Sequence, residues 1–263
     1  MYPVTYHRPA SVEEALHLLA EEEEAMALAG GQTLLPTMKQ HLAAPSALVD
    51  LAACGLSGIR AEGGGLVIGA MTTHAEIAAS AEVAAHLPVL GLVAAGIGDP
   101  AVRHRGTIGG SVANNDPAAD YPAALLALEA RIETDRRVLA AEEFFEGLFA
   151  TALEEGEIVT RIHLDPPKRA AYAKFPNPAS RYALVGVMVA ETAAGIRVAV
   201  TGAGEDGVFR HAGLEAALDA EFTPDAAAAV RVSPAGLAAD LHASAAYRAH
   251  LIAVMAARAV AAC

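Results

Sequence analysis

Two short stretches of this chain combine paired glycines with neutral hydrogen-bonding side chains: AGGQT at 29–33 and TIGGS at 107–111. Paired glycines allow a backbone to approach a ligand closely and to turn its N–H groups towards an anion. The Gln, Thr and Ser side chains add uncharged donors, so such a site can hold an anion without an arginine. Together the two stretches predict a cradle for a pyrophosphate, whereas either one alone is better explained as an ordinary tight turn.

A third glycine motif, GAGEDG at 202–207, matches the GxGxxG pattern of dinucleotide-binding proteins and follows an expected strand, IRVAVT. In that fold the glycines lead directly into a helix whose N-terminus faces the pyrophosphate. Here the next residues, VFRHAG, favour a returning strand, and Glu205 and Asp206 would place negative charge beside the phosphates. The motif therefore predicts a hairpin turn. The less favoured alternative is a Rossmann-type NAD-dependent dehydrogenase that uses Gly202, Gly204 and Gly207.

The chain is acidic, with 18 Lys and Arg against 31 Asp and Glu and a net charge of -13. This charge opposes non-specific binding to nucleic acid or to an anionic membrane. No window of roughly 18 residues is free of charge and apolar throughout, and the N-terminal residues do not combine a basic segment with an apolar run. We therefore expect a cytoplasmic protein with no nucleic-acid partner and no transmembrane segment.

The chain has two cysteines, Cys54 and Cys263, which lie far apart in sequence. They cannot form a disulfide framework or a four-thiolate site for an iron–sulfur cluster or zinc. The histidines form no HExxH or HxH pattern, and the settings of His7, His74 and His104 favour surface or turn positions over metal ligation. We therefore expect no metal site in this chain.

The residues around the glycine motifs predict the elements that position them. Ser11 and Glu14 form a capping-box pattern at the start of an amphipathic helix over 11–24. A short buried strand at 25–29 enters the first glycine pair, and a helix follows from Thr33 or Leu34. The next expected elements are a strand at 47–52, a hairpin with strands at 59–62 and 66–70, a helix capped by Thr72 or Thr73, and a buried helix over 87–98.

A proline pair, Pro166 and Pro167, predicts a boundary in the second half of the chain. Strands and a short helix are expected before it, over 131–145 and 155–165. After it the pattern predicts strands, among them a pair joined by a turn at 191–195, and then helices at 223–230 and 245–261. This last part has the usual length of a small α+β domain.

The stretch IGDPAVRHRGTIGGSVANNDPAADYPAALLAL at 97–128 closely resembles the flavin-binding signature of the medium, FAD-binding subunits in the xanthine dehydrogenase and carbon monoxide dehydrogenase family of molybdenum hydroxylases. YHRPASVEEALHLLA, AGGQTLLPTMKQ and EIVTRI are similar to that family as well, so the resemblance extends over about 6–189. It implies an α+β fold: a two-lobed FAD-binding fold of the vanillyl-alcohol-oxidase (PCMH) type with a C-terminal α+β domain. The implied domains are an N-terminal FAD-binding lobe at 1–55, a second lobe with TIGGS at 56–165, and a C-terminal flavoprotein domain at 166–263.

The same resemblance implies a set of FAD-binding residues. The two walls of the pyrophosphate site would be Ala29, Gly30, Gly31, Gln32, Thr33 and Leu34 on one side and Thr107, Ile108, Gly109, Gly110 and Ser111 on the other. Asp120 matches an aspartate near the ribose or ribityl hydroxyls; its other interpretation is the N-cap of the helix that follows, and both roles could hold at once. Ile97 and Val159 resemble flavin-packing residues. Lys174 and Tyr182 occupy positions close to the isoalloxazine, although a buried strand tyrosine is an equally ordinary interpretation of Tyr182.

The function implied by the resemblance is electron transfer. FAD carries out the redox chemistry, so this chain needs no catalytic acid or base. The resemblance implies an iron–sulfur small subunit with [2Fe-2S] clusters, a molybdopterin-binding large subunit, and a dimer of heterotrimers. FAD would take electrons from the iron–sulfur subunit and pass them to an external acceptor. A non-redox module that binds flavin or another nucleotide is the alternative.

Overall fold

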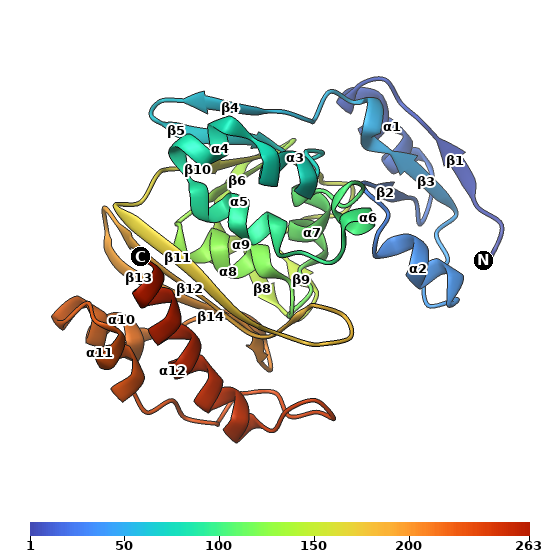
Figure 1. Ribbon diagram of the computed structural model, residues 1–263. Coiled ribbons are helices and arrows are strands. Elements are labelled where there is room, and N and C mark those ends of the chain that lie inside the picture. Colours follow the sequence, from blue (N-terminus) through green and yellow to red (C-terminus); the bar gives the residue numbers. More distant parts are fainter.

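The computed structural model describes residues 1–263 and arranges them around three main sheets (Figure 1). The N-terminal lobe holds a parallel sheet in the order β1-β3-β2, with β1 (Thr5–His7), β2 (Met26–Leu28) and β3 (Ala47–Asp50). Parallel neighbours need crossover connections, which α1 (Val12–Glu21) and α2 (Leu34–Lys39) provide. A short 3-10 helix at Leu51–Ala53 follows β3, so this strand is shorter than predicted.

The first helix begins as predicted and ends early. The Ser11 side chain accepts a hydrogen bond from the backbone N–H of Glu14, while the Glu14 carboxylate accepts from the backbone of Ala10. The helix stops at Glu21 instead of continuing to Glu24, which adopts a φ of 60°. A run of four glutamates at the negative end of a helix dipole is unfavourable, which explains the early end.

A five-stranded antiparallel sheet forms the middle of the molecule, in the order β4-β5-β10-β6-β7. Ile68, Ile132 and Ile162 pair across its central strands and are fully buried. The strands are β4 (Ile59–Glu62), β5 (Gly65–Gly69), β6 (Arg131–Thr134), β7 (Val138–Ala140) and β10 (Val159–Leu164). The helices between β5 and β6 are α3 (His74–Ala79), α4 (Ala81–His86), α5 (Pro88–Ala95), α6 (Pro100–Arg103), α7 (Ile108–Asn114) and α8 (Asp120–Ala127). A short helix, α9 (Ala141–Phe144), and a ribbon of β8 (Phe145–Gly147) and β9 (Ala150–Thr151) follow β7.

The C-terminal part is an antiparallel sheet, β11 (Arg169–Pro176), β12 (Ala183–Thr192), β13 (Gly195–Gly204) and β14 (Gly207–Arg210), with three helices on one face (Figure 1). These helices are α10 (Ala212–Ala220), α11 (Pro224–Ala229) and α12 (Ala245–Ala262). Side chains of β12 alternate between two cores. Val187 and Val189 join the cluster around α12, whereas Met188 and Ala190 join the cluster around α8. The helix α8 is buried along its whole length because it lies against this second face of the sheet.

The GAGEDG motif forms the predicted hairpin turn. Gly204 and Gly207 pair across the end of β13 and β14, and Gly207 has a φ of +97°. No helix follows these glycines directly, so the geometry of a dinucleotide-binding turn is absent. The predicted NAD-dependent alternative therefore has no support in the fold.

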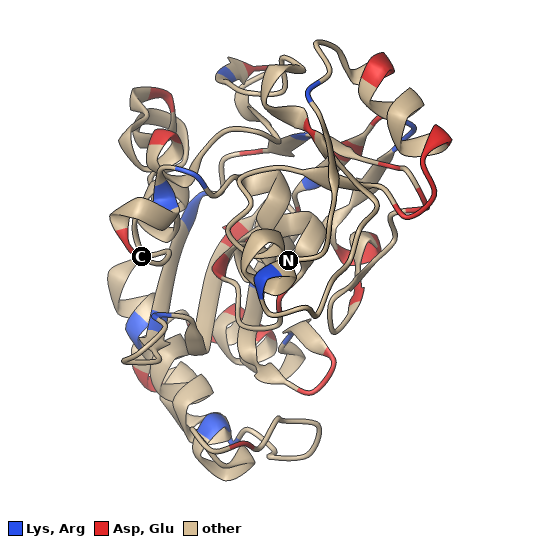
Figure 2. Ribbon diagram, turned by 90° about the vertical axis from the view of Figure 1, so that its right-hand side faces the viewer, with Lys and Arg blue, Asp and Glu red and all other residues tan.

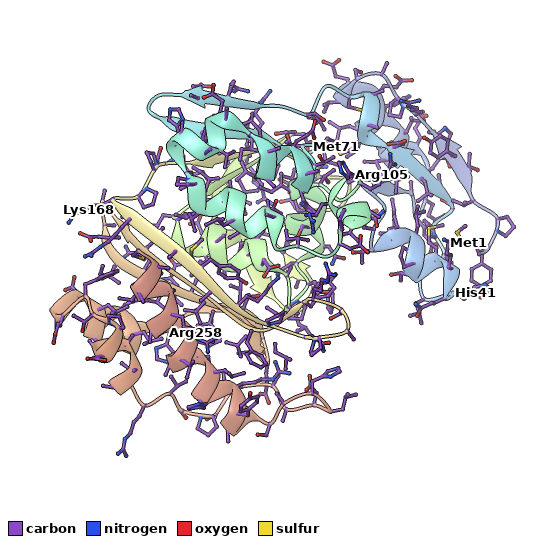
Figure 3. All side chains as sticks on the ribbon, viewed as in Figure 1. Met1, His41, Met71, Arg105, Lys168 and Arg258 are labelled. Carbon is purple, nitrogen blue, oxygen red and sulfur yellow. The ribbon has the colours of Figure 1, made fainter.

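The N-terminal lobe packs on the middle of the molecule through a small apolar cluster. Val49 and Leu51 of the lobe are buried together with Met71 and Ile158. Figure 3 shows Met71 and Arg105 at this junction. Acidic positions are scattered over many elements (Figure 2). None of the helices is both long enough and apolar enough to cross a membrane.

Candidate functional site

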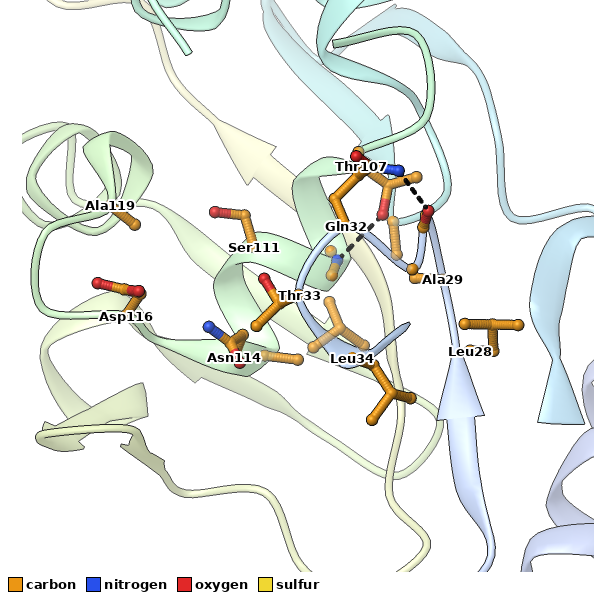
Figure 4. Close-up of a pocket in the computed structure, with 18 of the residues that line it drawn as sticks. Leu28, Ala29, Gln32, Thr33, Leu34, Thr107, Ser111, Asn114, Asp116 and Ala119 are labelled. Atoms are coloured by element: carbon orange, nitrogen blue, oxygen red, sulfur yellow. Dashed lines mark hydrogen bonds between the residues drawn. The ribbon is translucent and has the colours of Figure 1, made fainter. Parts of the chain in front are cut away.

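A cleft of about 610 Å³ runs along the junction between the N-terminal lobe and the middle of the molecule (Figure 4). Its volume is within the range of ordinary ligand sites. The 29–34 segment and the start of α7 form facing walls, and apolar side chains such as Leu28, Leu34 and Leu153 line much of the rest. All but two of the predicted site residues line this cleft; the exceptions are Ile108 and Lys174.

The first glycine turn presents a run of unused backbone donors. The N–H groups of residues 30–34 donate no hydrogen bond to any atom of the chain. Gly31 has a φ of +70°, a conformation that favours glycine and bends the chain so that successive N–H groups can converge. Such a concave run of amides is an anion-binding device. This turn therefore has the property predicted for it.

The second turn differs from the prediction, because four of its five amides, those of residues 108–111, already donate within the chain. TIGGS is the first turn of α7, and the N–H groups of Ile108 and Gly109 donate to the carbonyl oxygens of Thr72 and Ala70 at 3.0 and 2.8 Å. The Gly110 N–H donates to the Thr107 hydroxyl at 3.2 Å (Figure 4), and the Ser111 N–H donates to the Thr107 carbonyl. The expectation that both turns direct free amides at a ligand is therefore wrong for TIGGS, because a neighbouring loop supplies acceptors.

The glycines instead allow the two walls to approach each other. A Cβ atom on Gly30 would lie 2.0 Å from the Arg105 carbonyl oxygen, and one on Gly110 would lie 3.1 Å from the Ala29 Cβ. Gly109 is pressed against Ala70, where a Cβ would lie 2.5 Å from the Ala70 Cβ. Side chains at Gly30 and Gly110 would push the two walls apart, so these glycines set the width of the cleft, whereas Gly109 lets α7 pack on the residue that follows β5.

Three polar side chains in the cleft are free to bind a ligand. The hydroxyls of Thr33 and Ser111 and the carboxamide of Asn114 make no hydrogen bond within the chain. All three are visible around the facing walls in Figure 4. The sequence-based set omitted Asn114. Its position three residues after Ser111 on α7 is the signal that could have found it, because residues i and i+3 share a helix face.

Asp120 lines the cleft from within a buried polar network. Its carboxylate accepts hydrogen bonds from the Tyr172 hydroxyl at 2.5 Å and from Lys174 Nζ at 2.9 Å, and Lys174 also donates to the Gly96 carbonyl. Burial raises the pKa of Asp120, and the Lys174 charge opposes that rise. Gly186 makes room for this network, since a Cβ there would lie 2.1 Å from the Tyr172 hydroxyl.

Three sequence-based interpretations in this region change. The N-cap of α8 is Ala119, and Asp120 is the first residue of the helix, so the capping alternative for Asp120 is wrong. Lys174 lies behind the cleft wall because Asp120 and Gly96 hold its ammonium group. Tyr182 lies in the cleft wall just before β12 and is 43% exposed, so it is not a buried strand tyrosine. Ile97 and Val159 are apolar wall residues, as expected.

Arg181 is the one Lys or Arg side chain among the cleft residues. Its Nη1 donates to the Gly98 carbonyl across the cleft mouth at 3.1 Å, and its backbone has a φ of 66°. Asp116 and Asp120 also line the cleft, whereas the carboxylate of Glu157, another lining residue, is buried against Arg137 and Thr134. The cleft therefore attracts an anion through backbone dipoles and hydroxyls, with little help from formal charge.

His74 is buried next to the second turn, which corrects its predicted surface position. It is 4% exposed, its Nδ1 lies 3.2 Å from the Tyr121 hydroxyl, and Gly106 packs against its ring. Thr73 caps α3 as predicted, and the next residue turns inwards under the TIGGS helix. Burial lowers the pKa of His74 to about 4, so the ring is neutral at neutral pH.

We expect His74→Gln to flatten the pH dependence of stability. The pKa of His74 is about 4 in the folded chain against 6.5 for an unperturbed histidine, so the unfolded chain binds more protons between these values. This contribution to the free energy of unfolding is complete above pH 6.5. It falls by about 3 kcal/mol as the pH is lowered towards 4. Urea unfolding across this window measures it. His17→Gln, at an exposed helix position, is the control, and a wild-type slope in His74→Gln would contradict the assignment.

The cleft combines a run of free backbone amides, uncharged polar side chains beside it and a long apolar wall. These features are those of a protein that binds a nucleotide-type cofactor. The sequence matches, over residues 2–167, the family described as the FAD binding domain in molybdopterin dehydrogenase. The chain belongs to this family, and FAD is its cofactor. The predicted α+β FAD-binding fold of the PCMH type is thereby confirmed.

Named relatives agree with this assignment. The chain is 42% identical over 199 residues to the carbon monoxide dehydrogenase medium chain of Afipia carboxidovorans, covering 72% of this chain and 69% of the relative. It is 36% identical to the nicotine 6-hydroxylase medium subunit of Paenarthrobacter nicotinovorans, covering 95% and 93%. A solved structure of carbon monoxide dehydrogenase from Hydrogenophaga pseudoflava superposes with a TM-score of 0.90 at 37% identity, covering 100% of this chain and 98% of that one. The chain is therefore an oxidoreductase subunit, and the non-redox alternative is not favoured.

Proposed function

We propose that this chain holds FAD in the cleft between its lobes and relays electrons through it, from an iron–sulfur subunit to an external acceptor. The observation that carries the proposal is the run of free amides at residues 30–34, which faces the uncommitted hydroxyl of Ser111 across the cleft. A pyrophosphate is held by such hydrogen-bond donors. Because the net charge of this chain is negative and repels an anion, the attraction has to come from donors within the site itself. When bound, FAD accepts and releases electrons one or two at a time.

The proposed FAD site keeps the predicted residues and gives them distinct roles. The 29–34 turn donates backbone N–H groups to the pyrophosphate, while TIGGS sets the spacing and contributes the Ser111 hydroxyl. Asp120 accepts hydrogen bonds from ribose or ribityl hydroxyls through lone pairs that Tyr172 and Lys174 leave free. Ile97, Val159 and Tyr182 pack on the ring system. Lys174 does not contact the ring and acts on it only through its ion pair with the Asp120 carboxylate.

We further propose a division into domains at 1–55, 56–165 and 166–263. The proposal is supported by the three sheets, which fall within these ranges. The third range shares a core with the second, because Met188 and Ala190 pack against α8. The C-terminal sheet therefore stabilises the wall that carries Asp120.

The partners of this chain follow from its family. Medium subunits of molybdenum hydroxylases work with iron–sulfur and molybdopterin-binding subunits, and we propose a cytoplasmic dimer of heterotrimers with one FAD in each copy of this chain. The two cysteines lie apart, one buried and one exposed, which agrees with iron–sulfur clusters in a separate chain.

A flavin titration tests the proposal. The purified chain is mixed with FAD, excess cofactor is removed, and the absorption spectrum is recorded alone and with the partner subunits. Ser111→Ala is expected to weaken binding by roughly threefold to tenfold, the effect of one neutral hydrogen bond. Ser57→Ala, an exposed serine outside the cleft, serves as the matched control. Failure to bind FAD both alone and in the complex would overturn the proposal.

A further inference from the structure

The ribbon of β8 and β9 brings an exposed aromatic ring to the FAD cleft. The tip of the ribbon consists of Leu148 and Phe149, and Phe149 lines the cleft although it is 58% exposed. Phe149 and Tyr182 are the two cleft residues with a Phe, Tyr or Trp ring, and the Phe149 ring has no aromatic neighbour within the chain. A single exposed apolar residue is ordinary on a protein surface; this one is distinguished by the way its backbone is held.

The ribbon tip lies at the end of the cleft where Tyr182 is found. A second cavity, of about 550 Å³, adjoins this end, and Asp116, Ser180 and Tyr182 line both. Leu148 lines the second cavity, whereas Phe149 lines the FAD cleft. The tip therefore stands on the boundary between the two cavities, with one side chain on each side. This position places Phe149 at the end of the cleft that is proposed to hold the flavin ring system.

The backbone of the tip has a conformation that a phenylalanine rarely adopts. Phe149 has a φ of 54°, in the left-handed region, where the Cβ atom of an L-residue is crowded. A bulky residue in this region costs free energy, and such conformations persist only where the surrounding structure enforces them. The strain therefore indicates that the ring at position 149 has a use other than stabilising the folded chain.

Asn115 enforces the conformation of the tip. It is 1% exposed and ends α7 in a left-handed conformation of its own, with a φ of 42°. Its Nδ2 donates hydrogen bonds to the carbonyl oxygens of Gly147 and Ala150, on either side of the tip, both at 2.8 Å. The Phe149 N–H donates to the Asn115 carbonyl oxygen at 3.3 Å. One buried residue thus fixes the tip through three hydrogen bonds.

The ribbon is held between two parts of the fold. On one side, α7 carries TIGGS at its start and Asn115 at its end, so a wall of the FAD cleft and the anchor of the ribbon belong to the same helix. On the other side lies the GAGEDG hairpin, where a Cβ atom on Gly207 would lie 3.4 Å from the Gly147 carbonyl oxygen. The fold therefore sets the position of the Phe149 backbone relative to TIGGS before a cofactor binds.

We propose that Phe149 packs on the ring system of bound FAD and shields it from water, and that Asn115 is the residue that positions Phe149. The inference rests on the proposed function. A flat aromatic ring is stabilised by contact with another flat ring and by leaving water. Because the ribbon is already held in place, little freedom of its backbone is lost when the cofactor binds.

Equilibrium dialysis with FAD tests the contact, in the chain alone or in its complex with the partner subunits, whichever holds the cofactor. Phe149→Ala is expected to weaken FAD binding by roughly tenfold, the scale of one aromatic contact. Quenching of flavin fluorescence by acrylamide, a neutral quencher, should increase in the same variant, because the ring system is then open to water. Leu148→Ala is the matched control, because Leu148 is the adjacent tip residue, is 51% exposed and lies outside the FAD cleft.

Asn115→Gly tests the positioning role. Glycine accepts the left-handed backbone at this position, so the substitution removes only the carboxamide. We expect FAD affinity to fall by roughly threefold to tenfold and acrylamide quenching to increase. The double variant Asn115→Gly, Phe149→Ala should bind FAD no more weakly than Phe149→Ala alone, because Asn115 acts through the ring. Additive losses in the double variant would contradict the positioning role.

The wild type separates this inference from the proposed function. If the wild type holds FAD while Phe149→Ala shows unchanged affinity and unchanged quenching, this inference alone is overturned. A wild type that holds no FAD in either preparation contradicts the proposed function, and this inference with it.

Discussion

Gly30→Ala should reduce FAD affinity by roughly a hundredfold, equivalent to about 2.7 kcal/mol of binding free energy. The new Cβ would lie 2.0 Å from the Arg105 carbonyl oxygen, and both atoms belong to short, tightly packed backbone segments. Overpacking of this kind moves backbone and costs roughly 1–3 kcal/mol. Here it would also turn the amide donors of residues 30–34 away from the facing wall. Equilibrium dialysis with FAD measures the effect.

Two further variants separate loss of the site from loss of the fold. Gly110→Ala introduces milder contacts, at 3.0 Å to the Thr107 hydroxyl and 3.1 Å to the Ala29 Cβ, and should give an intermediate loss of affinity. Gly147→Ala is the control glycine, because its nearest neighbour would be 3.8 Å away. Unchanged FAD binding by folded Gly30→Ala and Gly110→Ala would show that the two walls do not hold the cofactor.

Lys174→Met should lower the free energy of unfolding by about 3–5 kcal/mol, the usual cost of leaving one charge of a buried pair uncompensated. The side chains of Lys174 and Asp120 are 12% and 5% exposed. Without the ammonium group, Asp120 would be ionised in a buried site or would take up a proton. The destabilisation should therefore be smaller in acid than at neutral pH. Urea denaturation at acid and at neutral pH measures the loss of unfolding free energy and its pH dependence.

The double variant Lys174→Met, Asp120→Asn should recover most of this loss, because it removes both charges. Lys168→Met is the matched control, at the residue just before the same strand, β11. Lys168 pairs with Glu191 at 2.7 Å, but its side chain is 73% exposed, so the change should cost less than about 1 kcal/mol. Equal effects of the two lysine variants would show that Asp120 does not depend on Lys174.

Local patterns predicted most of the elements around the site. Apolar periodicity and turn residues identified β2, the turn at 30–31, the hairpin of β4 and β5, the capped helix α3, and the hairpin at 204–207. These features depend on residues close in sequence, which is why one sequence is enough to predict them. The family assignment likewise followed from dense motifs within single segments, and the match over residues 2–167 confirmed it.

The errors at His74 and around Asp120 have a common cause, since each depends on a contact between distant segments. From its sequence neighbours, His74 was predicted at a surface or turn position beside a helix cap, but Tyr121 and Gly106 enclose it. A helix cap was the other interpretation of Asp120, but Tyr172 and Lys174, from a strand about fifty residues away, bind its carboxylate. Such partners are set by packing, which sequence patterns do not specify.

The sequence by itself determined most of the secondary structure, the family and the cofactor, because short-range patterns and motif residues carry that information. Only the tertiary structure decided which glycine turn offers free amides. A backbone N–H is available to a ligand only if no other segment brings it an acceptor, and the Ala70 and Thr72 carbonyls do so for TIGGS but no carbonyl does so for residues 30–34. The tertiary structure also placed a second cavity beside the FAD cleft, because its walls come from segments that meet only in the folded chain.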